Sequence, residues 1–197
     1  MFKLLVRLVG VLTGICVVSA FLLTFVREGT KGQIEYQQLK ALMAPAVKVV
    51  LPPSDNDPIA DRVKVTIGTG KKARKITVFP AKKGGKLFAL AYTASASGHG
   101  GPVEVMVGIT VDGKILGVKV VKHSETPGIG TKVTNSKEFM SQFVGKTWNS
   151  KIALSNAGGD IQAISGATES SLAVTNAVAN AMKIFQVVKQ KLESKLG

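Results

Sequence analysis

The sequence predicts an α+β protein, in which a single N-terminal transmembrane helix is followed by an antiparallel-sheet domain with a long C-terminal helix. Three observations lead to this fold class. Residues 8–26 contain no charged side chain, an Asp112-Gly113 pair separates two β-rich segments, and apolar residues recur at steps of three and four near the C-terminus. Strands that follow one another, with helices set apart from them, are typical of an α+β domain built on antiparallel sheet.

The first expected element is the transmembrane helix over residues 8–26. Its 19 uncharged residues nearly match a hydrocarbon core of about 30 Å at about 1.5 Å per residue. A cleaved signal peptide is the alternative, because Val18-Ser19-Ala20 resembles a cleavage site, but the apolar run continues beyond it. The only cysteine, Cys16, lies in this run, which excludes a thiolate metal cluster elsewhere in the chain. We therefore expect a membrane anchor over residues 1–30.

The next segment, residues 31–61, is expected to connect the anchor to a domain over residues 62–197. A short helix is predicted for residues 32–46, and Leu51-Pro52-Pro53 must end any helix that precedes it. The polar stretch from Asp55 to Asp61 then predicts a linker.

Alternating segments rich in Val, Ile and Thr predict the strands of the domain. The Asp-Gly pair favours a tight turn between two of them. A short helix with Phe139, Met140 and Phe143 facing inward should follow, and Trp148 beyond it is expected to pack in the core. The expected strands cover residues 62–67, 75–79, 103–111 and 114–121, and the expected short helix covers residues 136–144.

The last element is a helix predicted to begin near Thr168 and to reach Lys195, from the apolar period between Val174 and Leu192. A helix N-terminus carries unpaired N–H groups and a partial positive charge, so it can bind a phosphate without a dedicated cation. Simple helix capping is the alternative interpretation. Four hydroxyl side chains lie around this helix start: Ser165, Thr168, Ser170 and Ser171.

The formal net charge of the chain is +14. All 12 acidic residues and all but two of the 26 basic ones follow residue 26. The lysines are spread over many segments, aromatic residues are few and the chain starts in a membrane, so we do not expect nucleic acid as a partner. Anionic membrane lipid or an acidic protein partner fits this charge better.

Two motifs resemble those of a known family. Ser165-Gly166-Ala167-Thr168, followed by Ser170 and Ser171, resembles the S/T-G-A-T-x-S/T signature of FMN-binding domains in the Rnf and Na+-translocating NADH:quinone reductase complexes. The segment His123-Ser124-Glu125-Thr126-Pro127-Gly128-Ile129-Gly130 is similar to the H-x-E-T-P-G-L-G loop of the same family. The length of the chain favours the G subunit of the Rnf complex over the usually longer C subunit of the quinone reductase.

The resemblance implies a covalent cofactor. FMN would be attached through its phosphate to Thr168 by a flavin transferase that uses FAD, and this bond would make the chain a phosphoprotein. The second motif would lie beside the flavin ring. The cofactor-binding residues implied in this way are Thr168, Ser165, Gly166, Ala167, Ser170, Ser171, Glu125, Thr126, Pro127, Gly128 and Ile129.

The function implied by the resemblance is electron transfer within a membrane complex. The chain would be an electron-carrying flavoprotein subunit that works with other membrane subunits of an Rnf-type complex, which moves Na+ or H+. No stand-alone catalysis, catalytic residue or metal site is expected of this chain. The family also implies a single-pass protein of the inner membrane, with its domain on the outer, periplasmic face.

Two alternatives come from particular residues. Gln162 stands where the family usually has an acidic residue, and the nearest acid is Asp160, which favours a membrane-anchored binding or assembly module of the same fold without flavin. The second alternative is an esterase, because Gly98-His99-Gly100-Gly101 resembles an oxyanion strip. The sequence contains no G-x-S-x-G nucleophile elbow. We therefore expect these glycines to form a turn at the end of a strand.

Overall fold

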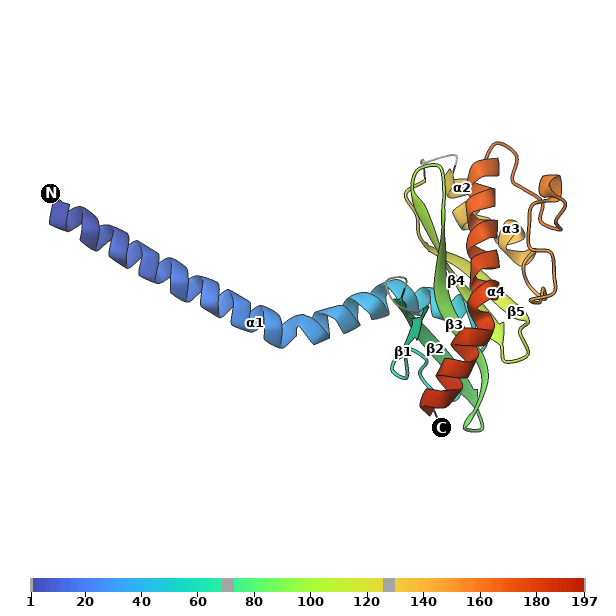
Figure 1. The fold of residues 1–197 in the computed structure, drawn as a ribbon, viewed down its shortest axis with the longest axis horizontal. Coiled ribbons are helices and arrows are strands. Elements are labelled where there is room, and N and C mark those ends of the chain that lie inside the picture. The colour runs from blue at the N-terminus through green and yellow to red at the C-terminus, as the bar shows by residue number, and fades with distance from the viewer. Residues whose placement is uncertain (1, 69–72, 126–129, 197) are drawn as a thin grey trace. The chain divides into compact units, whose positions relative to one another are not determined.

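A computed structural model of the chain describes residues 2–68, 73–125 and 130–196 (Figure 1). The chain divides into two compact units, Met1–Ala41 and Leu42–Gly197. The second unit contains an antiparallel sheet and a long C-terminal helix, which confirms the predicted α+β class. The functional division expected at residues 30 and 61 stays a prediction.

The first helix, α1 (Phe2–Val50), is continuous, so the expectation of separate helices over residues 8–26 and 32–46 is wrong. Residues 27–44 contain no proline, and a glycine in a helix interior costs only about 1 kcal/mol relative to alanine. Nothing in that stretch is therefore strong enough to end the helix. Within α1, Val6–Lys31 is long and apolar enough to cross a membrane, and no other helix in the described part of the chain meets this test.

The sheet has five antiparallel strands in the order β1-β2-β3-β4-β5. Four of them correspond to predicted segments, whereas β3 was not delimited from the sequence, because its alanine-rich segment has a low β-propensity. β4 and β5 form the predicted hairpin, and Gly113 occupies its turn with φ 85°. The strands are β1 (Val63–Ile67), β2 (Arg74–Lys83), β3 (Lys86–Ser97), β4 (Pro102–Thr110) and β5 (Ile115–Lys122).

One face of the sheet is covered by α4 (Thr168–Leu196), whose bounds agree with the prediction to within one residue (Figure 1). The apolar stripe of α4 packs against β1, β3 and β4 and forms the main core. Tyr92 on β3 donates a hydrogen bond from Oη to the carbonyl oxygen of Ala181 at 2.8 Å. Burial raises the pKa of the Tyr92 phenol above its ordinary value.

The last turn of α1 packs against the sheet within the second unit. Gly108 on β4 and Gly117 on β5 are register partners, and both lie against Val50. A Cβ atom on Gly108 would come within 2.0 Å of the Val50 carbonyl oxygen, and one on Gly117 within 3.0 Å of Val50 Cα. These two glycines are therefore required for the close approach of the helix backbone to the sheet.

Two short helices, α2 (Gly130–Asn135) and α3 (Lys137–Ser141), follow β5. The predicted inward side chains of this region, Phe139, Met140 and Phe143, are buried. Trp148 is 57% exposed, so its expected place in the core is wrong. It lies instead over the hairpin turn, where a Cβ atom on Gly113 would be 2.9 Å from Trp148 Cδ1.

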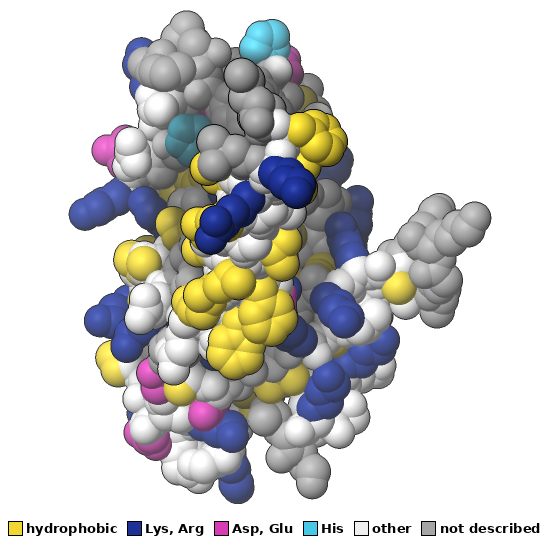
Figure 2. All heavy atoms as spheres, turned by 90° about the vertical axis from the view of Figure 1, so that its left-hand side faces the viewer, with side chains coloured by type: hydrophobic (Ala, Val, Ile, Leu, Met, Phe, Trp, Pro, Cys, Tyr) yellow, Lys and Arg dark blue, Asp and Glu magenta, His cyan; other side chains and the backbone are white. Residues whose placement is uncertain are grey.

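The basic residues do not form one compact stripe. Figure 2 shows Lys and Arg side chains spread over one face of the molecule, with few Asp and Glu side chains among them. This distribution matches the even spread of lysine along the sequence.

Candidate functional site

The site is built around the start of α4, where Thr168 is the first helical residue. Gly166, two residues earlier, has φ 74°, a left-handed conformation that favours glycine. Ala167 is buried, whereas Ser165, Gly166 and Thr168 are exposed. The turn through Gly166 therefore presents the Thr168 side chain at the surface, at the positive end of a 29-residue helix.

Ser171 holds this loop against the first turn of the helix. Its Oγ accepts a hydrogen bond from the Ile164 N–H at 3.1 Å and donates one to the Ala167 carbonyl oxygen at 2.9 Å. The Ser171 side chain is fully buried. Its hydroxyl therefore shapes the loop that precedes Thr168 and is not open to a ligand.

The two sequence motifs meet at Glu125 and Ser170. Ser170 Oγ donates a hydrogen bond to Glu125 Oε2 at 2.7 Å, and the Gly100 N–H donates one to Glu125 Oε1 at 3.2 Å. Glu125 is only 7% exposed. Two donors on its two oxygens suit the carboxylate form, which accepts hydrogen bonds and donates none. This carboxylate joins the segment after β5, the β3–β4 turn and the start of α4.

Glycines make room for the Glu125 side chain. A Cβ atom on Gly98 would lie 2.2 Å from Glu125 Oε1, and one on Gly130 would lie 2.4 Å from Glu125 Cβ. On Gly100, a Cβ atom would meet the Ser124 carbonyl oxygen at 2.3 Å. A larger residue at any of these three positions would displace the carboxylate or the backbone beside it.

A cavity of about 410 Å³ lies at this junction. Its volume is within the range of small-molecule sites, roughly 300–1,000 Å³. It brings Thr168 from the first motif and Glu125 from the second to one surface. The lining residues are His99, Glu125, Gly130, Gly166, Ala167, Thr168, Glu169 and Ser170. Ser165 and Ser171 are not among them, and Thr126, Pro127, Gly128 and Ile129 lie outside the described residues.

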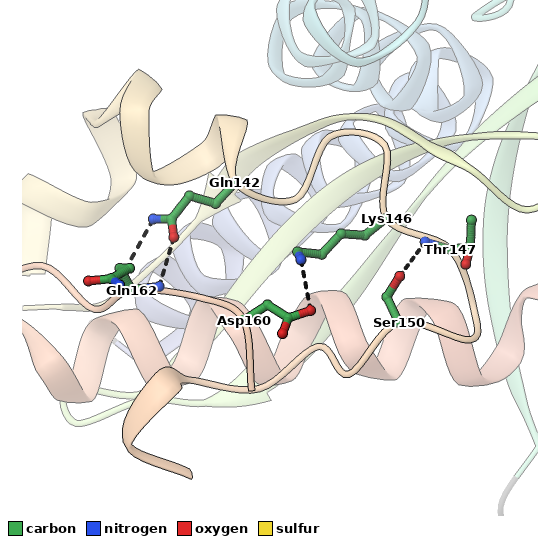
Figure 3. Close-up of polar contacts among 6 residues, drawn as sticks. All are labelled: Gln142, Lys146, Thr147, Ser150, Asp160 and Gln162. Atoms are coloured by element: carbon green, nitrogen blue, oxygen red, sulfur yellow. Dashed lines mark hydrogen bonds and ion pairs between the residues drawn. The ribbon is translucent and has the colours of Figure 1, made fainter. Parts of the chain in front are cut away.

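The segment before the signature, which contains Asp160 and Gln162, forms hydrogen bonds with the end of α3 and an ion pair with the loop that follows α3 (Figure 3). The Gln142 side-chain amide pairs with the backbone of Gln162: the Gln162 N–H donates to Gln142 Oε1 at 2.7 Å, and Gln142 Nε2 donates to the Gln162 carbonyl oxygen at 3.1 Å. Asp160 Oδ2 forms an ion pair with Lys146 Nζ at 3.0 Å. The backbone at Gln162 is therefore fixed, while Gln162 itself is exposed.

Two further observations on the described residues distinguish the cavity at Thr168 from other parts of the domain. An apolar hollow of about 300 Å³ between β5 and α3 carries no residue of either motif. Among the described residues, no group of three or more His, Cys, Asp or Glu side chains could hold a metal ion. The cavity at Thr168 is thus the place where the motif residues and a ligand-sized space coincide.

The sequence alone did not assign Gly98, His99 and Gly100 to this site. The Gly98-His99-Gly100-Gly101 pattern could have indicated them, but it was interpreted only as a turn at the end of a strand. That turn exists between β3 and β4, where the Gly98 N–H donates to the Gly101 carbonyl oxygen at 2.8 Å. The contact of the turn with Glu125 could not be derived from the sequence.

Comparison with known proteins identifies the class of domain. Residues 98–183, which include the β3–β4 turn and both motifs, match the model of the FMN-binding domain. This part of the second unit is thus similar to an FMN-binding domain, and it follows a helix that is long and apolar enough to cross a membrane.

The most informative relatives are components of ion-translocating complexes. The G subunit of the ion-translocating oxidoreductase complex of Cereibacter sphaeroides is 30% identical over 188 residues, which cover 89% of this chain and 82% of the relative. The G subunit of the Na(+)-translocating ferredoxin:NAD(+) oxidoreductase complex of Acetobacterium woodii is 28% identical, and the match covers 94% of this chain and 93% of the relative. The chain belongs to the G-subunit family of ion-translocating oxidoreductase complexes.

A solved structure shows a more distant likeness. The crystal structure of Shewanella oneidensis NqrC is 24% identical to this chain, with a TM-score of 0.45. The match covers 72% of this chain and 74% of that chain.

Proposed function

We propose that this chain is the electron-carrying flavoprotein subunit of a membrane-bound oxidoreductase of the Rnf type, and that it carries FMN attached through its phosphate to Thr168. The observation that carries the proposal is the position of Thr168. It is exposed, begins a long helix and lines the same cavity as Glu125 of the second motif.

Thr168 suits the attachment better than the other hydroxyl side chains of the signature. Ser170 and Ser171 are buried, and their hydroxyls are hydrogen-bonded within the protein. Ser165 is exposed but does not line the cavity. Thr168 alone among these four combines an exposed position with a place at the cavity, so a transferase could reach it and the product could occupy the cavity.

The attachment is a phosphoryl-group transfer to the Thr168 hydroxyl. The Thr168 oxygen forms a bond to the phosphorus of the FMN half of FAD, the bridging P–O bond of the pyrophosphate breaks, and AMP leaves while the hydroxyl loses its proton. The N-terminus of α4 stabilises the phosphate through its unpaired N–H groups and partial positive charge. Gly166 and Ala167 shape this end of the site, and Ser165, Ser170 and Ser171 support it.

The isoalloxazine ring supplies reversible one- and two-electron chemistry. Attachment through the phosphate leaves the ring unmodified and keeps the cofactor at high local concentration. We infer that Glu125, Thr126, Pro127, Gly128 and Ile129 lie beside the ring. In this arrangement the hydrogen bond between Ser170 and Glu125 connects the loop beside the flavin ring to the phosphate end of the site.

The proposal includes partners and a location. The chain would work with the other membrane subunits of an ion-translocating complex that moves Na+ or H+, and a flavin transferase would modify it. Val6–Lys31 would cross the inner membrane once, with the domain on the outer face. The net charge of +14 would favour contact with anionic lipid.

The experiment that tests the attachment is in-gel fluorescence after coexpression with a flavin transferase. The native chain should show flavin fluorescence that survives denaturing electrophoresis, and Thr168→Ala should abolish it. Ser194→Ala, which removes an exposed hydroxyl at the other end of α4, is the control and should retain the signal. Persistent fluorescence in Thr168→Ala would reject the assignment, whereas a native chain without flavin absorbance would favour the flavin-free assembly module.

A further inference from the structure

The turn between β3 and β4, residues 98–101, takes part in the cavity although neither sequence motif includes it. We propose that His99, the one residue of this turn with a side chain, contacts the phosphate of FMN linked to Thr168. The inference rests on the proposed attachment at Thr168 and adds a binding residue to that site.

The position of His99 is set by the glycines around it. Gly98 and Gly100 lie so close to Glu125 and Ser124 that a Cβ atom on either would come within 2.3 Å of an oxygen atom. The Gly100 N–H donates to Glu125 Oε1, and the Gly98 N–H donates to the Gly101 carbonyl oxygen. The turn is thus fastened on both sides of residue 99. His99 itself is exposed and lines the cavity together with Thr168.

The charges around the cavity give His99 a specific role. Among the described residues that line the cavity, Glu125 and Glu169 are acidic and His99 is the only basic one. A phosphodiester carries one negative charge, which the two carboxylates disfavour and the N-terminus of α4 favours. An imidazolium donates a charge-assisted hydrogen bond to a phosphate oxygen and offsets this repulsion. His99 is therefore the group suited to balance the charge of the bound phosphate.

The charged groups that share the cavity are Glu125 after β5 and Glu169 on α4. The other histidine of the chain, His123, lies two residues before Glu125 and is not among the lining residues.

The test is ³¹P NMR of the full-length flavinylated chain in detergent, recorded for the native chain and its variants under one set of conditions. His99→Gln should shift the phosphodiester resonance away from its native position. His99→Arg, which keeps a nitrogen donor for the phosphate, should leave the resonance closer to that position than His99→Gln does. His123→Gln is the matched control and should leave the resonance unchanged.

An unchanged phosphodiester resonance in His99→Gln would overturn the inference, as would an equal shift of the resonance in His123→Gln. These outcomes leave the attachment at Thr168 intact. A native chain that shows no phosphodiester resonance after coexpression with the transferase would reject the attachment, and with it the contact of His99. Because His99 is exposed and makes no contact in the core, its variants should fold, and a thermal unfolding curve checks this for each.

Discussion

Ser170 and Glu125 are 45 residues apart in the sequence, and Ser170 Oγ lies 2.7 Å from Glu125 Oε2. Both side chains are at least nine-tenths buried. A buried carboxylate destabilises a protein unless it is hydrogen-bonded. The hydrogen bond between these two residues therefore stabilises the buried carboxylate and joins the two motifs.

Replacement of Ser170 by alanine should lower the free energy of unfolding by about 1–3 kcal/mol, because it leaves a buried carboxylate oxygen without its donor. Denaturant titration of the full-length chain in detergent measures this change. Ser194→Ala, in the exposed last turn of α4, is the matched control and should change stability by less than about 0.5 kcal/mol. Equal stabilities of the two variants would contradict the structural role of the Ser170 hydroxyl.

Tyr92 predicts a pH dependence of stability at alkaline pH. Unfolded tyrosine titrates near pH 10, and burial raises the pKa of Tyr92 in the folded state. The contribution of the neutral phenol is therefore complete below about pH 10 and decreases as the pH rises above it, because unfolding then releases a proton. Tyr92→Phe should lower the free energy of unfolding by about 1 kcal/mol at neutral pH through the lost hydrogen bond to Ala181.

The difference in unfolding free energy between the native chain and Tyr92→Phe should then shrink or change sign near pH 11, since the phenylalanine variant has no phenol to ionise at this position. Denaturant unfolding at about pH 8 and about pH 11 gives this difference. A difference that stays constant between the two pH values would show that Tyr92 is not responsible for the alkaline loss of stability.

The free edge of β1 predicts an effect on aggregation. Lys191 Nζ donates to the Thr66 carbonyl oxygen at 2.5 Å, and Lys195 Nζ donates to the Lys64 carbonyl oxygen at 2.7 Å. Unpaired backbone groups on an edge strand can pair with another chain, and lysine discourages this. The double variant Lys191→Ala/Lys195→Ala should therefore aggregate faster on incubation, as measured by light scattering. Lys183→Ala/Lys189→Ala removes the same charge from α4 and should leave the aggregation rate close to that of the native chain.

Gln162 predicts a change in the efficiency of modification. If a carboxylate at this position serves the transferase, an amide cannot replace it, because it binds a cation only weakly. Gln162→Asp should therefore raise the fraction of protein that carries FMN after brief coexpression, and Asp160→Asn should lower it. The Gln142 amide contacts only the backbone of Gln162, so the substitution keeps this anchor. If neither variant changes the modified fraction, the transferase recognises the loop without a carboxylate.

Local signals in the sequence predicted the elements that depend on local physics. The Asp112-Gly113 pair predicted the β4–β5 hairpin, and the apolar period predicted α4 from its first residue, Thr168. The strand β3 was missed because it is rich in alanine, which has a low β-propensity. The burial of Ala89, Ala91 and Ala94 depends on tertiary packing, which the local sequence does not indicate. The continuity of α1 was missed because the change from apolar to polar composition was interpreted as a boundary, although residues 27–44 contain no proline.

The site was predictable only in part, for a related reason. The two motifs could be recognised in the sequence, but the Ser170–Glu125 hydrogen bond depends on how the segment after β5 packs against α4. The glycines at positions 98 and 100 indicated only a turn, because the sequence does not contain the distance to Glu125 that makes them necessary. His99 was assigned to no site for the same reason. Contacts between distant segments had to come from the structure.

The central claim is that Thr168 carries FMN through a phosphoester bond. Its most direct test is the intact mass of the full-length chain after coexpression with a flavin transferase, followed by peptide mapping. We predict a mass increase of one FMN less one water, located on the peptide that contains Thr168 and absent in Thr168→Ala. An unmodified mass, obtained while the transferase modifies a control substrate, or an adduct on a different residue, would contradict the account.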